Sequence, residues 1–164
     1  MPDKETIERA HEDAREGKSP STQAGEFVRE EMEHVREGKH GARSTKQAIA
    51  IGLSKARRAG VKLPASKRSS KRTKKQAKRD LSKGRKRRRK TSSTRSRTVR
   101  GALRREGHKA ASRRSLSKQA RTSARRRTAS ERSASARQAS RTKGAAGRSA
   151  AARKAARTRA RHRR

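Results

Sequence analysis

The stretch that decides the fold reads STKQAIAIGLSKARRAGVKLP and covers residues 44–64. Ser44 and Gln47 have the spacing of a capping box, in which side chains satisfy the free backbone N–H groups at the start of a helix. Gly60 suits the left-handed position that ends a helix, and Pro64 cannot continue one. Between these signals the apolar residues recur at helical spacing, with Ile49, Leu53 and Ala56 on the inner face. The stretch therefore predicts a helix with both ends marked.

Two further helices are predicted upstream. The first is short and ends at Gly17. The second ends at Gly38 and carries an apolar stripe at helical spacing, made of Ala24, Phe27, Val28, Met32 and Val35. We therefore expect residues 1–64, called the head below, to be a small all-α unit of two to three short helices arranged as a helical hairpin. A core this small is marginal by itself, which favours a homodimer formed through the head.

A short motif recurs along the chain. Arg-Glu-Gly-Lys occupies residues 15–18 and 36–39, and Arg-Glu-Gly-His follows at 105–108. Hydroxyl residues and a Gln-Ala pair come shortly after the first two copies, and Gln-Ala also follows the third. The repeat predicts one unit used several times: a helix, a glycine stop, a basic loop, a hydroxyl cap and a new helix.

Charge divides the chain at residue 64. Residues 1–64 hold 13 Lys/Arg and 11 Asp/Glu, whereas residues 65–164, called the tail below, hold 40 Lys/Arg and 3 Asp/Glu. A segment this polar cannot bury enough apolar surface to offset the entropy of ordering it. We therefore expect a long, largely disordered basic tail with short helices in places. Its predicted parts are a Lys/Arg-rich disordered linker at 65–97, a weak helical pair at 98–127, and an Arg/Ala/Ser-rich disordered segment at 128–164.

The tail indicates nucleic-acid binding. A net charge of +37 over a hundred residues far exceeds what solubility requires. Phe27 is the only aromatic residue of the chain, so the tail has no platform for stacking on unpaired bases. This favours duplex DNA, bound and compacted without sequence specificity by a histone-like, nucleoid-associated cytoplasmic protein. The alternative is an RNA- or ribosome-associated basic protein, which would use structured RNA as its partner through the same charges.

The candidate phosphate-binding residues are the densest cationic groups of the tail. They are Lys74, Lys75, Lys78, Arg85, Lys86, Arg87, Arg88, Arg89, Lys90, Arg104, Arg105, Arg113, Arg114, Arg125, Arg126 and Arg127. A helix-turn-helix that reads bases is a weaker alternative, in which Lys46, Lys55, Arg57 and Arg58 would face phosphates. The connection before that helix is longer than the usual tight turn, so we interpret these residues as the basic rim of a structural helix.

Other function classes find little support. The chain has no nucleophile elbow, phosphate-binding glycine loop or Ser–His–Asp order, so we expect no enzyme. It has no cysteine, which excludes disulfides and thiolate metal sites. No apolar run is long enough to span a bilayer, and the tail has no apolar face for a membrane surface, so we expect no membrane partner.

Two Glu-x-x-His spacings fall on predicted helices, at Glu8–His11 and at Glu31–His34. Such a spacing places a carboxylate and an imidazole on one helix face, as in metal-binding bundles. The helices here are short, and the spacing arises by chance in Glu-rich helices. The sequence therefore leads us to expect no metal site and no cofactor.

The segment from Glu30 to Pro64 resembles a small bacterial domain family of unknown function whose members share the stretch KQAIAIGLSKA, here residues 46–56. The resemblance covers roughly the first 64 residues, and its shared block runs from Glu31 through Gly60. Members of that family often carry Lys/Arg/Ala-rich extensions and are described as putative DNA-binding proteins. The resemblance implies a bacterial source and carries no catalytic residue over to this chain.

Overall fold

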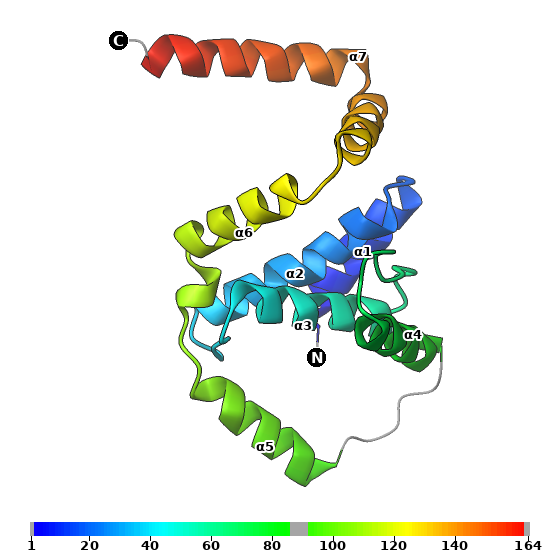
Figure 1. Cartoon of the computed structure of the whole chain (residues 1–164), viewed down its shortest axis with the longest axis vertical. Helices are drawn as coiled ribbons and strands as arrows, with labels where there is room; N and C mark the ends of the chain where they lie inside the picture. Colours follow the sequence, from blue (N-terminus) through cyan, green and yellow to red (C-terminus); the bar gives the residue numbers. More distant parts are fainter. Residues whose placement is uncertain (1, 86–91, 163–164) are drawn as a thin grey trace. The chain divides into compact units, whose positions relative to one another are not determined.

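The computed structural model describes residues 2–85 and 92–162, and every element it contains over these ranges is helical. The elements are α1 (Lys4–Arg15), α2 (Pro20–Arg36), α3 (Thr45–Arg58), α4 (Lys71–Arg85), α5 (Ser93–Arg104), the 3-10 turn η1 (Lys109–Ala111), α6 (Arg113–Arg125) and α7 (Ala129–His162) (Figure 1). The chain forms two compact units, a first unit of residues 1–120 and a second unit of residues 121–164. No helix of the described residues is both long and apolar enough to cross a membrane.

Side-chain caps set the ends of α2 and α3. The Ser19 hydroxyl accepts from the Thr22 backbone N–H at 3.4 Å, and the Ser44 hydroxyl accepts from the Gln47 N–H at 3.2 Å. The Gln47 side chain does not complete the reciprocal box, because its Oε1 accepts from the backbone N–H of Arg43, one residue earlier, at 3.1 Å. These bonds satisfy donors that a helix start otherwise leaves free.

Two apolar clusters hold the first unit together. One joins α1, α2 and the C-terminal half of α3, with Ala10, Ala24, Phe27, Ala56 and Val61 buried in it. The other lies near the α2–α3 connection, with Met32, Val35, Ala42, Ala48, Ala110 and Ala111 buried. Between them Gly52 allows α3 to approach α2 closely, because a Cβ at this position would lie 2.7 Å from the Cα of Val28.

Helix α4 packs on α3, where the sequence predicts a disordered linker. Its buried residues Ala77 and Asp80 and the half-buried Gly84 are spaced i, i+3, i+7 and share one helix face. Asp80 is 1% exposed and accepts hydrogen bonds from Ser54 Oγ and Arg58 Nε, both at 2.9 Å. The single carboxylate of this segment thus gives α4 a docking face. That is why the linker prediction for residues 65–97 is wrong over α4.

The segment from Leu103 to Leu116 completes the core of the head. Its backbone carbonyls at Leu103 and Gly107 accept from the N–H groups of Gly41 and Ala42 at 2.9 and 3.1 Å. The turn η1 buries Ala110 and Ala111 against α2 and α3, and Leu116 of α6 packs on the same cluster. The third copy of the Arg-Glu-Gly motif therefore contacts the loop that follows the second copy. The expectation that α1–α3 alone form the folded unit is corrected by these contacts.

The second unit is also helical, so the predicted disordered segment at 128–164 is wrong as well. Thr128 and Glu131 form a reciprocal capping box, with bonds of 3.3 and 2.9 Å, at the start of α7. Alanine and arginine have high intrinsic helix propensity, whereas each like-charge pair at i, i+4 costs only about 0.2–0.5 kcal/mol. The prediction gave this repulsion too much weight. Gly144, at φ 63°, interrupts α7 with a kink.

Candidate nucleic-acid interface

The outward face of α4 is cationic. Lys71, Lys75 and Lys78 are spaced i, i+4, i+7 on the side of the helix away from its contact with α3, and Arg72 and Arg79 flank them. All five side chains are exposed, and no carboxylate of the described residues lies within ion-pair distance of any of them. The one acid of α4, Asp80, is buried on the opposite face and pairs with Arg58. The docking of α4 therefore orders a row of unpaired positive charges.

The candidate residues predicted from the sequence lie on several elements rather than in one cluster. Lys74, Lys75 and Lys78 are exposed on α4, Arg104 and Arg105 lie at the end of α5, and Arg113 and Arg114 lie in the first turn of α6. Arg125, Arg126 and Arg127 lie at the end of α6 and in the turn before α7. Arg85 is the last residue of α4, and the run from Lys86 to Lys90 lies outside the described residues.

The cations of α3 are mostly engaged within the chain. Lys55 contacts Glu30 and Glu31, Arg58 pairs with Asp80, and Arg57 Nε donates to the Leu63 carbonyl at 2.8 Å. Of the four residues named for a helix-turn-helix, only Lys46 is exposed with no contact to a described partner. This arrangement agrees with the interpretation of α3 as a structural helix and leaves little of it for contacts with bases.

Pairing of this kind is common in the head. Lys18, for example, lies 2.7 Å from Asp13 and 2.6 Å from Glu16. The hydrogen bonds to these two carboxylates raise the pKa of Lys18 above its usual value. The charges of the head are thus balanced locally, whereas those of α4 are not.

Helix α7 carries exposed arginines at helical spacing on each side of its kink at Gly144, which sequence reasoning did not resolve. Arg137 and Arg141 are four residues apart, and so are Arg153, Arg157 and Arg161; all five side chains are exposed. The four-residue spacing of these arginines is the sequence signal that would predict their alignment along a helix over residues 129–162. Each such pair repels across one turn, and a polyanion along the helix would remove that repulsion.

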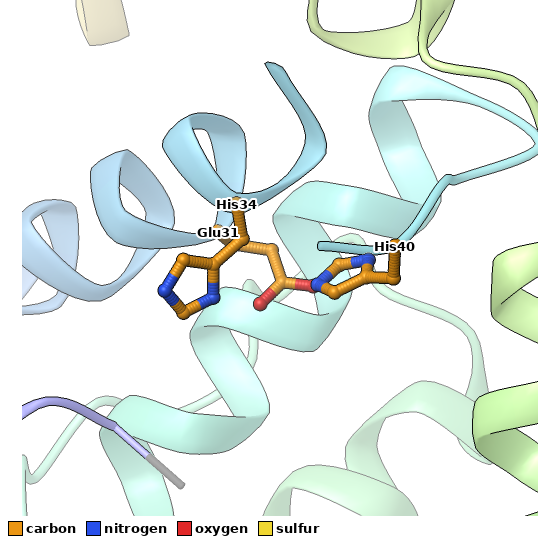
Figure 2. A group of neighbouring side chains, drawn as sticks. All are labelled: Glu31, His34 and His40. Atoms are coloured by element: carbon orange, nitrogen blue, oxygen red, sulfur yellow. The ribbon is translucent and has the colours of Figure 1, made fainter. Parts of the chain in front are cut away.

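A separate group of polar side chains in the head is built around two buried carboxylates. It consists of Glu30, Glu31 and His34 of α2, His40 of the following loop, and Lys55 of α3. Burial opposes the charge on Lys55, but its contacts with Glu31 and Glu30 outweigh that effect and raise the pKa of Lys55 above its usual value. Glu31, His34 and His40 point toward one another, with the carboxylate between the two imidazole rings (Figure 2). They are one of two groups among the described residues that could hold a metal ion; the other is Asp3, Glu30 and His34.

Comparison with known proteins identifies one relationship. Residues 15–68 match the model of a family of unknown function, DUF6496. The match spans α2, α3 and their connection and stops before α4. It confirms that the head resembles a family of unknown function, and the family's description names no ligand. No curated protein and no solved structure matches the chain.

Proposed function

We propose that this protein binds duplex DNA without sequence specificity and compacts it by neutralising backbone phosphates. The proposal rests on one observation above all, the ordered row of unpaired cations on the outward face of α4. Arg and Lys side chains on a helix face can follow a phosphate backbone, and Arg can hold a phosphate with two parallel hydrogen bonds.

The distribution of charge supports bridging as well as binding. Residues 65–120 of the first unit hold 24 Lys/Arg against 2 acids, and the second unit holds 16 Lys/Arg against 1 acid. Each unit therefore has enough excess positive charge to bind a polyanion by itself. A chain with two such units can contact two segments of duplex, which is the physical basis for compaction by a nucleoid-associated protein.

The chemistry favours backbone recognition. The chain has a single aromatic residue, Phe27, which is 1% exposed in the core of the head. No aromatic side chain is therefore free to stack on unpaired bases, which proteins that read single strands commonly require. Structured RNA presents a similar phosphate backbone and is the second candidate partner.

Binding of a 30-base-pair DNA duplex and of an RNA hairpin, each measured over a salt series, tests the proposal. We expect tight DNA binding. The logarithm of the association constant should fall linearly with the logarithm of the salt concentration, with a slope of about 0.9 for each phosphate contact. A chain ending at Arg127 keeps α6 whole and removes 12 Lys/Arg of the second unit; it should show a smaller slope. Salt-independent binding would contradict the proposal, and tighter binding to RNA would favour the second candidate.

A further inference from the structure

The buried polar group of the head has a charge imbalance. Glu30 and Glu31 are 3% and 0% exposed, and Lys55 is the one lysine or arginine that the structure places against them, 3.2 Å from Glu30 Oε1 and 2.7 Å from Glu31 Oε2. Two buried carboxylates with one ammonium leave a net negative charge. A buried charge without compensation is costly, so this site favours a further cation.

The missing cation is indicated most clearly at Glu31 Oε1. Both oxygens of Glu31 are inaccessible to solvent, and neither accepts a hydrogen bond of good geometry, although Lys55 lies close to Oε2. On its other side Oε1 lies 3.3 Å from His40 Nε2. His40 Nδ1 lies 3.1 Å from the Gly41 carbonyl, which can only accept, so Nδ1 carries the proton. With Nδ1 protonated, Nε2 faces the carboxylate oxygen either with a second proton of its own or with a lone pair, and a lone pair needs a cation between the two atoms.

We propose that Glu31, His34 and His40 bind a Zn²⁺ ion, with Glu31 Oε1 and His40 Nε2 as two of its ligand atoms. In a tetrahedral site with bonds of 2.0–2.1 Å, neighbouring ligand atoms are about 3.3 Å apart. The separation of Oε1 and Nε2 has this value. A ligand atom from each of the three residues lies within 4.8 Å of the others, so closing the site on the ion requires movements of roughly 1.5 Å or less.

The atoms of the three ligands that do not face the ion have partners that fit this assignment. Metal-binding histidines usually donate their other N–H to a carboxylate or a backbone carbonyl. His40 has the Gly41 carbonyl in this position, and His34 Nε2 lies 3.4 Å from Asp3 Oδ2, which leaves Nδ1 of His34 for the ion. Lys55 holds the Oε2 of Glu31, so this carboxylate would bind the ion through Oε1 alone.

The fold fixes the ligand that comes from a loop. His40 is flanked by Lys39, whose N–H donates to the His34 carbonyl at 3.0 Å, and by Gly41, whose N–H donates to Leu103. Glu31 and His34 are one turn apart on α2. The pair Glu8 and His11 has the same spacing, but both side chains are exposed on α1 and no third ligand joins them in the described residues. The structure therefore separates two spacings that the sequence leaves equivalent, and our proposal departs from the expectation of no metal site for one of them.

Three protein ligands leave a fourth position for water. Two imidazoles and a carboxylate are a ligand set that suits Zn²⁺ and its spectroscopic substitute Co²⁺. In the head this ion would join α2 to the α2–α3 loop, next to the contacts with Leu103 and Gly107.

Titration of the chelator-treated, full-length protein with Co²⁺ and Zn²⁺ tests the assignment. We expect one Co²⁺ per chain with visible d–d absorption that Zn²⁺ displaces, and we expect His40→Ala to weaken Zn²⁺ binding by about 100-fold. Asp3→Asn removes only the negative charge beside His34 Nε2 and should weaken Zn²⁺ binding about 10-fold. Asp3 is exposed, so the Asp3→Asn variant should fold normally. It therefore still tests the site if His40→Ala does not fold.

His11→Ala is the matched control, because it removes an exposed histidine outside the group and should leave binding unchanged. The proposal is overturned if Co²⁺ binds without saturation or without d–d bands. It is also overturned if His40→Ala, Asp3→Asn and His11→Ala all bind Zn²⁺ as the wild type does. None of these readouts depends on nucleic-acid binding.

Discussion

Replacing Asp80 with alanine should release α4 from α3 while leaving the rest of the head folded. Asp80 is 1% exposed and accepts from Ser54 Oγ at 2.9 Å, Arg58 Nε at 2.9 Å and Gln76 Nε2 at 3.2 Å. The other buried residue of α4 among residues 71–84 is Ala77, a small side chain, and the half-buried Gly84 lies against the Arg57 carbonyl. The carboxylate is therefore the main source of the docking energy.

The magnitude follows from the surroundings of Asp80. Removing one partner of a fully buried ion pair costs about 3–5 kcal/mol, because the other charge stays buried. The Arg58 side chain is 50% exposed and can return to water, so the cost here should be lower, about 2–3 kcal/mol. An isolated 15-residue helix is marginal in water, so α4 should then open locally.

Hydrogen exchange of the full-length protein, followed by mass spectrometry, measures this opening directly. We expect amides of residues 71–85 to exchange about 30- to 150-fold faster in Asp80→Ala, which is the factor that corresponds to 2–3 kcal/mol. Amides of α1 and α2 should be unaffected. Glu12→Ala, which removes an exposed carboxylate of α1, is the control and should change nothing in α4. Equal exchange of α4 in Asp80→Ala and the wild type would refute the docking argument.

Two further substitutions test the core of the head. Gly41→Ala would place a Cβ on the backbone carbonyl of Glu106 and should lower the free energy of unfolding, measured in urea, by about 2–3 kcal/mol. Gly25 in α2 has open space around it, so Gly25→Ala should raise this free energy by about 0.5–1 kcal/mol. Equal effects of the two substitutions would contradict the contact between Gly41 and Glu106. Lys55→Met leaves Glu30 and Glu31 without their ammonium and should cost about 3 kcal/mol in the presence of a chelator. Because the pKa of Lys55 is raised in the folded state, the stability that its charge contributes is complete below the usual lysine pKa of 10.5. This stability is lost as the pH rises through the higher pKa of the folded state. The difference in stability between Lys55→Met and the wild type should therefore shrink only at strongly alkaline pH.

Local signals in the sequence predicted the ends and the inner faces of α2 and α3, although not the further segments that complete the head. The cap at Ser44, the glycines that end α1 and α2, and the apolar stripe of α2 all depend on neighbouring residues, and such patterns can be read from the chain. The match to a family of unknown function covers the same part of the chain. Here the physics of capping and helical periodicity is sufficient.

Long-range contacts account for what the sequence did not predict. The average composition of residues 65–97 hides the face made by Ala77, Asp80 and Gly84, and nothing local indicates that Asp80 pairs with Arg58, 22 residues earlier. The contact between Gly41 and the segment after Leu103 crosses more than 60 residues in the same way. The Glu31–His34 spacing was visible, but its meaning depends on His40 and on burial, which only the fold supplies.

The central claim is that the cations on the outward face of α4 bind backbone phosphates. The most direct measurement is the salt dependence of duplex DNA binding by the full-length protein with Lys71, Lys75 and Lys78 all changed to Gln. The matched control changes Lys4, Lys46 and Lys62 to Gln, which removes the same charge from exposed positions of the head. We predict that the first variant loses up to about 2.7 units of log–log slope, 0.9 for each contact, and that the control loses less than about 0.5. Equal losses in the two variants would contradict the claim, because they would show that only net charge matters.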